Sequence, residues 1–380
     1  MKENKMGVMP VNKLLISMSL PMMISMLVQA LYNIVDSIFV SRINENALTA
    51  VSLAFPIQAL LIAFGTGTGV GVNAVLSKAL GEKDHKKASK AATNAIFLAV
   101  MTYLVALIIG LCFVGIFYRS QTDDTEIVSY GIQYLTIVCV FSIGMLMQMM
   151  LEKLLQSTGK TIFSMITQTV GAIINIIMDP ILIFGLFGMP KMGVAGAAIA
   201  TIFGQCVGSA LALFFNLKFN KEISLSMKGF KPDPSMIGKI YSVGIPSIIM
   251  QAIGSLMTYG MNRILITFSS TATAVFGVYF KIQSFIFMPV FGLNNGMIPI
   301  ISYNYGARKK ARLQKAMRYG IIYAVSIMAV GLIIMQLFPG KLLGIFDASD
   351  YMLQIGIPAI RIISLSFLCA GFGIAGSSIF

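Results

Sequence analysis

The sequence predicts an all-α polytopic membrane protein with two related helical lobes, and three observations support this prediction. The first is composition, because 57% of the 380 residues are hydrophobic and only 11% are charged, whereas a soluble domain carries roughly 25% charged residues. The second is a succession of apolar runs, each long enough to cross a hydrocarbon core of roughly 30 Å as a helix. The third is an internal repeat. Together they exclude a soluble fold, a disordered chain and a disulfide scaffold.

Ten spans follow one another along the chain, at about 14–40, 50–77, 91–117, 127–151, 161–185, 193–217, 238–266, 273–302, 319–338 and 352–378. Each is continuously apolar rather than alternating, which is typical of spanning helices and not of spanning strands. We expect six helices in an N-lobe over residues 1–217 and four in a C-lobe over 238–380. Residues 218–237, which are basic and contain two prolines, form the predicted cytoplasmic connector.

Lysine and arginine are concentrated in alternate loops. The N-terminal segment and the even-numbered loops contain most of the 28 basic residues, whereas the odd-numbered loops contain Arg42, Arg119, Lys191 and Lys341. The positive-inside rule therefore places the N-terminus in the cytoplasm. This distribution also accounts for the net charge of +14, so a nucleic-acid partner is not expected.

The sequence matches itself when it is shifted by 225 residues. The coincident pairs include Ser17 and Ser242, Pro21 and Pro246, Gly67 and Gly292, Gly71 and Gly296, Ser77 and Ser302, and Gly81 and Gly306. A general likeness among membrane helices does not explain glycine, proline and polar matches that stay in register across two spans and a basic loop. Because six spans separate the copies, both begin on the same side of the membrane. The repeat is therefore parallel, with its axis along the membrane normal.

The second copy of the repeat is shorter than the first. Phe380 corresponds to Leu155, which ends the fourth span of the first copy. Counterparts of spans five and six are therefore expected but absent, either because the chain is a fragment of a 6+6 protein or because its C-lobe is incomplete. We expect a fragment, because a truncated lobe would leave packing faces open to lipid.

Several short motifs occur in order along the whole chain. They are Ser19-Leu20-Pro21, Tyr32-Asn33-Ile34-Val35-Asp36, Leu48-Thr49-Ala50-Val51-Ser52, Leu155-Gln156-Ser157-Thr158-Gly159 and the segment Gly193 to Thr201. They resemble motifs of the multidrug and toxic compound extrusion (MATE) family, especially its bacterial MepA-like branch. The resemblance implies two six-helix lobes facing each other across a central cavity in a bacterial cytoplasmic membrane. It also implies export of cationic drugs and other organic compounds, driven by inward Na⁺ or H⁺.

Two carboxylates fall inside the predicted spans. They are Asp36 and Asp179, while Glu152 is expected at a cytoplasmic helix end and the other acids in loops or termini. An ionised carboxylate in hydrocarbon is costly, so it usually faces a cavity, a cation or a partner. Both helices begin in the cytoplasm, and the acids lie at similar depth in the outer half, so they can share one site.

Each carboxylate shares a helical face with other polar residues. The two faces are Gln29, Asn33 and Asp36 at i, i+4 and i+7, and Asn175 and Asp179 at i and i+4. Pro180 frees a carbonyl beside the second face, and such oxygens suit a hard cation or a shared proton. The resemblance implies a cation-coupling site at Asp36, Asn175, Asp179 and Thr201, with Na⁺ held by the first three if it is the coupling ion. The alternative is that Asp36 merely ends its helix near Arg42, or that both acids only satisfy helix contacts.

The second copy differs, because its predicted spans contain no carboxylate. Coupling is therefore expected in the first lobe alone. Gln283, Asn294 and Asn295 are candidates to face the cavity, although inter-helix hydrogen bonding is their more ordinary role. The glycines of the second span, Gly65, Gly67, Gly69 and Gly71, indicate close helix packing or a hinge.

An ion-coupled antiporter is the function that these features favour, acting as a monomer on small organic substrates with no cofactor besides the coupling ion. An enzyme is not expected, because the predicted spans contain no histidine and no catalytic pair. The four cysteines show no disulfide or zinc spacing. A lipid or polysaccharide flippase of the same superfamily is the main alternative, and it would line its cavity with bases. A channel is a further alternative, but the asymmetric acids and the parallel repeat fit alternating access better.

Overall fold

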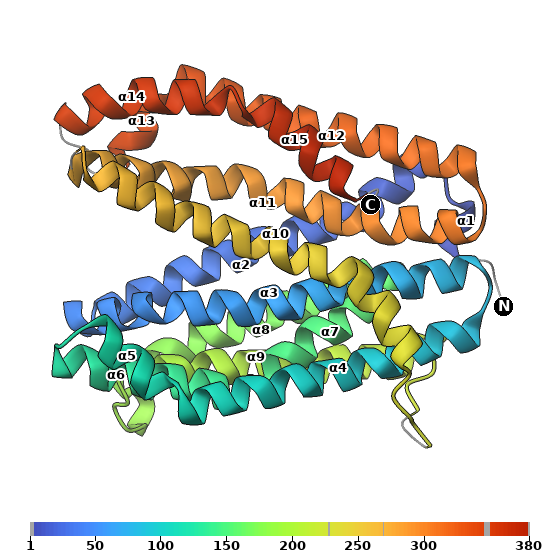
Figure 1. Ribbon diagram of the computed structural model, residues 1–380, viewed down its shortest axis with the longest axis horizontal. Helices are drawn as coiled ribbons and strands as arrows, with labels where there is room; N and C mark the ends of the chain where they lie inside the picture. The colour runs from blue at the N-terminus through green and yellow to red at the C-terminus, as the bar shows by residue number, and fades with distance from the viewer. Residues whose placement is uncertain (1–3, 227–228, 269, 346–349, 379–380) are drawn as a thin grey trace.

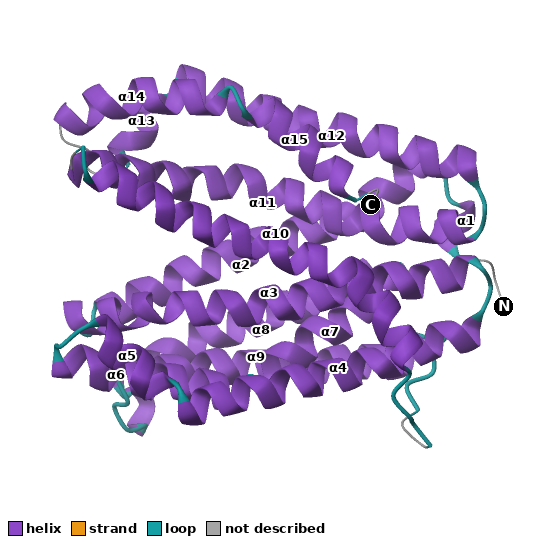
Figure 2. Ribbon diagram, in the orientation of Figure 1, coloured by secondary structure: helices purple, strands orange, loops and turns teal. Residues whose placement is uncertain are grey.

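The computed structural model describes residues 4–226, 229–268, 270–345 and 350–378, so Phe380 lies outside the described residues. Within these ranges the regular structure is helical (Figures 1 and 2). The elements are α1 Lys5–Val8, α2 Val11–Ser41, α3 Glu45–Gly81, α4 His85–Cys112, α5 Val114–Gln121, α6 Thr125–Val140, α7 Ile143–Ser157, α8 Thr161–Phe184, the short 3₁₀ helix Leu186–Gly188, α9 Val194–Phe219, α10 Pro234–Ile266, α11 Ser270–Gly306, α12 Lys310–Leu337, α13 Pro339–Gly344, α14 Asp350–Ser364 and α15 Phe367–Ser377.

The predicted spans correspond to long helices or to bent pairs of helices. Among the described residues, eight helices are long and apolar enough to cross a membrane, and two bent pairs bring the number to ten if each pair is one span. The pair α6 and α7 is bent by 44°, and the pair α14 and α15 by 45°. At these breaks Ser142 and Ser366 each donate to the carbonyl three residues earlier, at 2.8 Å. Such bonds compete with the helical ladder, and both copies of the repeat bend at nearly the same place.

The helices form two groups, which we call the N-lobe and the C-lobe. In the N-lobe, α2, α3, α4, α6, α7, α8 and α9 pack on one another, and in the C-lobe α10, α11, α12, α14 and α15 do so. Figure 1 shows that the two groups lie close together at one end and diverge towards the other. We name the first the basic end, which carries α1 and residues 82–84, 220–226, 229–233 and 307–309. The opposite, far end carries α5 and α13.

The lobes meet at a seam, which α2 and α3 of the N-lobe form with α10 and α11 of the C-lobe. A Cβ atom at Gly71 would lie 2.1 Å from the carbonyl oxygen of Ile240, and one at Gly296 would lie 2.7 Å from the Cα of Ser19. A larger residue at either position would force the helices apart. The close-packing interpretation of the glycine-rich run is therefore confirmed at the seam.

The contacts of the seam are reciprocal. Gly67 faces Ile248, and its repeat counterpart Gly292 faces Met23, which is the counterpart of Ile248. The other reciprocal sets are Gly71 with Gly244 and Gly296 with Ser19, and Gly81 with Tyr303 and Gly306 with Lys78. Exchanged contacts of this kind are produced by a two-fold axis. The parallel repeat predicted from the sequence therefore has its axis in the seam.

The short helix α1 contacts both lobes at the basic end. On the N-lobe side, the Asn4 amide donates to the carbonyl of Thr158 and to the carboxylate of Glu222. On the C-lobe side, the carbonyl of Met6 accepts hydrogen bonds from Asn304 Nδ2 and Arg312 Nη2, both at 3.2 Å. The N-terminal segment thus joins the lobes where they are closest.

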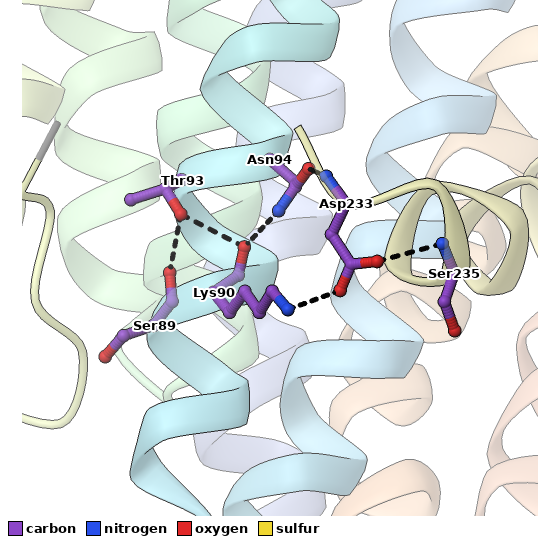
Figure 3. A network of polar contacts seen from close by, with 6 residues as sticks. All are labelled: Ser89, Lys90, Thr93, Asn94, Asp233 and Ser235. Atoms are coloured by element: carbon purple, nitrogen blue, oxygen red, sulfur yellow. Dashed lines mark hydrogen bonds and ion pairs between the residues drawn. The ribbon is translucent and has the colours of Figure 1, made fainter. Parts of the chain in front are cut away.

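The segment between α9 and α10 is attached to α4 (Figure 3). Lys90 Nζ pairs with Asp233 Oδ2 at 2.6 Å, and Asn94 Oδ1 accepts from the backbone N–H of Asp233 at 3.1 Å. The other carboxylate oxygen of Asp233 accepts from the N–H of Ser235 and so caps α10. The hydrogen bond from Lys90 is the main cause that lowers the pKa of Asp233. One residue therefore begins the first helix of the C-lobe and anchors it to the N-lobe.

Candidate cation site in the N-lobe

The predicted cation site lies where α2, α8 and α9 pack together. With the Asn175 amide oriented so that both of its atoms have partners, its oxygen accepts from the backbone N–H and the hydroxyl of Thr201, at 3.1 and 3.2 Å. Its nitrogen then donates to Asp179 Oδ2 at 3.2 Å. The helices can approach this closely because a glycine lies on each. A Cβ at Gly204 would lie 2.6 Å from the carbonyl oxygen of Gly171.

The two predicted acids are neighbours inside the lobe. Asp179 is fully buried and Asp36 is partly buried. Their side chains are near enough for the charges to interact. Each acid has a buried Oδ1 atom to which no described residue donates a hydrogen bond. An unsatisfied carboxylate oxygen is costly inside a membrane protein, so the pair has unused capacity for a cation or a proton.

The chemistry of the site indicates which ions it can take. The groups that can coordinate are carboxylate, amide and hydroxyl oxygens, which hard cations prefer. Among the described residues, no group of three or more His, Cys, Asp or Glu side chains is placed to hold a metal ion. Two carboxylates with neutral oxygens therefore match a hard cation such as Na⁺, or a proton, better than a soft transition metal.

A small internal cavity of about 40 Å³ adjoins the site. It is lined by Tyr32, Gln148, Gln168, Gly171, Ala172, Asn175, Thr201 and Gln205. A water molecule needs roughly 10–15 Å³ of such space and at least two polar partners, so the cavity can hydrate the amide and hydroxyl of the site. The three glutamines are not recognisable as a group in the sequence, because their helices must pack before they come together. Their one signal in the sequence is a polar residue within an apolar span.

The candidates on α2 have different surroundings. Gln29 Oε1 accepts from Gln168 Nε2 at 3.2 Å, so this residue joins α2 to α8. Asn33 is exposed. The three residues predicted to share a helical face therefore have different surroundings. Gln29 bonds to another helix, the Asn33 amide is exposed, and Asp36 lies at the site.

The candidates on α11 include one residue that joins the lobes. Gln283 and Asn294 are half-buried, and Asn294 Oδ1 has no hydrogen-bond donor among the described residues. Asn295 Oδ1 accepts from Lys153 Nζ of α7 at 2.9 Å. For Asn295, inter-helix hydrogen bonding is therefore the observed arrangement.

The placement of Glu152 at a helix end was wrong. Helix α7 continues to Ser157, and both Glu152 and Lys153 are only 7% exposed. Glu152 Oε1 accepts from Gln148 Nε2 at 3.0 Å and from Thr167 Oγ1 at 2.8 Å. The predicted span 127–151 ends before the helix does, because the bent pair α6 and α7 follows a longer path than one straight helix. The polar end of α7 is consequently inside the protein.

Two helical lobes related by a two-fold axis and joined at one end are the architecture of a membrane transporter rather than of an enzyme. The chain belongs to the MatE family, because the model of that family matches residues 21–181 and 246–380. The two matched segments begin at equivalent positions of the repeat.

Known proteins resemble the chain over almost its full length. The multidrug export protein MepA of Staphylococcus haemolyticus (strain JCSC1435) is 28% identical over 362 residues, which are 95% of this chain and 79% of the relative. MepA of Staphylococcus aureus (strain MRSA252) is 26% identical over 369 residues, which are 96% of this chain and 80% of the relative. A solved structure described as the outward-facing conformation of a multidrug resistance MATE family transporter has a TM-score of 0.93 and 26% identity, and the match covers 100% of this chain and 84% of that one. The chain is accordingly a multi-pass bacterial membrane protein.

Proposed function

We propose that the chain is an antiporter that exports small organic, mainly cationic compounds in exchange for Na⁺ or H⁺. The observation that carries this proposal is the pair Asp36 and Asp179, each with a buried oxygen that lacks a donor among the described residues. The names of the MepA relatives and the likeness to an outward-facing multidrug resistance transporter support export as the direction and organic compounds as the cargo. In this proposal the protein acts as a monomer in the cytoplasmic membrane, with the basic end on the cytoplasmic side.

Helix α2 provides a physical route from the site to the seam. Asp36 lies at the site, and Ser19 and Met23 of the same helix contact the seam glycines of α11. Two neighbouring ionised carboxylates repel each other, and binding of a cation or a proton removes that repulsion. Pro21, between the two seam contacts, removes one ladder hydrogen bond, so α2 can bend there. Filled and empty sites then favour different arrangements of the lobes, which is the requirement for coupling.

The alternative function, a lipid or polysaccharide flippase, requires bases that bind phosphate. The internal cavity beside the site is lined by amides, hydroxyls and apolar residues, and the ionisable pair next to it is acidic. An organic cation therefore matches the charge of this site better than a phosphate ester does.

The test is transport by the purified chain in proteoliposomes under an imposed Na⁺ or pH gradient, with ethidium as the cationic probe. Asp36→Asn and Asp179→Asn keep the side-chain size and remove the charge. Each should lower gradient-driven transport to the level of protein-free vesicles. Asp123→Asn is the matched control, because Asp123 is an exposed acid of the far end, and it should transport like the parent.

Three results would contradict the proposal. Normal gradient-driven transport by Asp179→Asn would make this acid structural. Ethidium transport that persists after both gradients are removed would exclude ion coupling. Movement of a fluorescent phospholipid in place of ethidium would favour the flippase.

A further inference from the structure

A buried charged contact between the lobes is added to the reciprocal packing of the seam. Lys153 of the N-lobe donates to Asn295 of the C-lobe at 2.9 Å. In the register of the repeat, the counterparts of these residues are Ser378 and Val70, and this pair cannot form the equivalent charged bond. The contact is therefore an addition to the two-fold packing of the glycines and not a part of it.

The ammonium group of Lys153 is buried, and among the described residues it forms no direct ion pair, although the charge of Glu152 is near enough to interact with it. The residue is 7% exposed, and its side chain passes over Gly69, where a Cβ would lie 2.8 Å from the Lys153 Cγ. Lys153 takes part in neither of the ion pairs Lys87 with Glu82 and Lys90 with Asp233. The adjacent Glu152 is turned into the N-lobe, where its carboxylate accepts from Gln148 and Thr167.

A buried charge opposes the packing that buries it. Taking an ammonium group out of water is unfavourable unless good partners replace the water, and apolar replacements of buried charges often stabilise a protein. Separation of the lobes returns Lys153 to water, so this residue favours an open basic end. Asn295 acts in the opposite direction, because it supplies a hydrogen bond that exists only while the seam is closed.

We propose that Lys153 and Asn295 together set the balance between a closed and an open basic end, and thereby keep the closure reversible. Lys153 is in this sense a positioning residue, which acts on the lobes and not on cargo. The inference rests on the proposed transport by alternating lobe arrangements. Its test measures the spacing of the lobes, so it can fail or succeed independently of the assignment of the cation site.

Pulsed electron paramagnetic resonance on the purified chain in lipid nanodiscs can measure this balance. Spin labels would be attached at Lys86→Cys on α4 and Lys310→Cys on α12, two exposed positions of the basic end, after replacement of the four native cysteines. Lys153→Met keeps the packing over Gly69 and removes the charge, so the long-distance, open population should fall roughly tenfold. Asn295→Leu leaves the ammonium group without its acceptor, so the open population should rise roughly tenfold.

Two further variants make the interpretation specific. In the Lys153→Met background, Asn295→Leu should have little effect, because no ammonium group remains to be satisfied. Lys239→Met removes an exposed charge on α10 and should leave the distances unchanged. The proposal is overturned if Lys153→Met and Asn295→Leu shift the distances in the same direction, if neither shifts them, or if the effect of Asn295→Leu is the same in both backgrounds.

Discussion

A single glycine determines how Tyr118 is held at the far end. Tyr118 is fully buried, and its hydroxyl donates to the carbonyl oxygen of Ala50 at 2.7 Å. A Cβ at Gly131 would lie 2.0 Å from an atom of the Tyr118 ring. Because the ring is enclosed on all sides, it cannot move away. Helices α5 and α6 can therefore pack together here only if residue 131 has no side chain.

We expect Gly131→Ala to lower the free energy of unfolding by about 3 kcal/mol, at the upper end of the usual range for overpacking. Tyr118→Phe removes one hydrogen bond and should cost about 1 kcal/mol. Thermal unfolding in detergent measures both changes. Gly115→Ala is the control, since the nearest atom to its Cβ would be Ile132 Cδ1 at 4.0 Å. If Gly131→Ala unfolded at the same temperature as Gly115→Ala, the packing argument would be refuted.

The Thr201 hydroxyl allows a second residue-level prediction. It donates to the Asn175 amide oxygen, so Thr201→Val keeps the shape and loses the bond. The apparent affinity for the coupling ion should fall roughly tenfold, the equivalent of one hydrogen bond, whereas Thr201→Ser should behave like the parent. The measurement is the ion-concentration dependence of ethidium transport in proteoliposomes. Equal ion affinities for the Val and Ser variants would show that the Thr201 hydroxyl does not contribute to the site.

Parts of the site could be predicted because the cost of a charge in a membrane and the helical period are both readable from a sequence. These two rules selected Asp36, Asn175 and Asp179, and the structure places the latter two in one hydrogen-bonded group with Thr201. Their role in coupling stays a prediction. The glutamines of the cavity could not be selected, because a polar residue in an apolar helix has several uses and packing decides among them. The bond from Lys153 to Asn295 joins residues of different lobes, so no local pattern indicates it.

At the level of elements, the start of α10 depends on one carboxylate with two tasks. Asp233 caps α10 and pairs with Lys90 of α4. Asp233→Asn keeps the cap and loses the ion pair, whereas Asp233→Ala loses both, so the Ala variant should melt at the lower temperature. Melting temperatures in detergent provide the comparison. Identical melting of the two variants would mean that the cap contributes nothing.

The same carboxylate gives a prediction for pH. The pKa of Asp233 lies below its ordinary value of 3.8 because Lys90 donates to the carboxylate. A carboxyl group of this kind contributes stability that is fully present above its ordinary pKa and is lost as the pH falls through the lower folded value. The melting difference between parent and Asp233→Asn should therefore stay constant from about pH 5 to about pH 8 and shrink only in stronger acid. A difference that vanished near neutral pH would contradict this account.

The helices themselves were more predictable than their bends. Each apolar run formed a spanning helix or a bent pair, because hydrocarbon leaves the backbone few alternatives. The breaks at Ser142 and Ser366 were not predicted, because serines that bond to the backbone also occur within unbroken helices, such as Ser52 in α3 and Ser326 in α12. That missing bend is also the reason why Glu152 was misplaced.

For the whole molecule, orientation is the prediction that can be checked most directly. The distribution of basic residues places the basic end in the cytoplasm. In intact cells a membrane-impermeant thiol reagent should label Asp123→Cys and leave His85→Cys and Lys310→Cys unlabelled, and all three should react after lysis. All three positions are exposed, so a lack of reaction cannot result from burial. The reverse pattern would invert the topology and the proposed direction of transport.

The exchanged contacts across the seam resemble those between the subunits of a symmetric dimer. An interface in which each partner presents the same patch is that of a homodimer, and here the two partners are halves of one polypeptide, related by a shift of 225 positions. The chain therefore has the internal form of a self-pairing dimer whose two subunits are joined in one polypeptide. The acids of the N-lobe and the bond from Lys153 to Asn295 are differences between its two halves. One polypeptide can carry such differences, whereas a homodimer must carry every substitution twice.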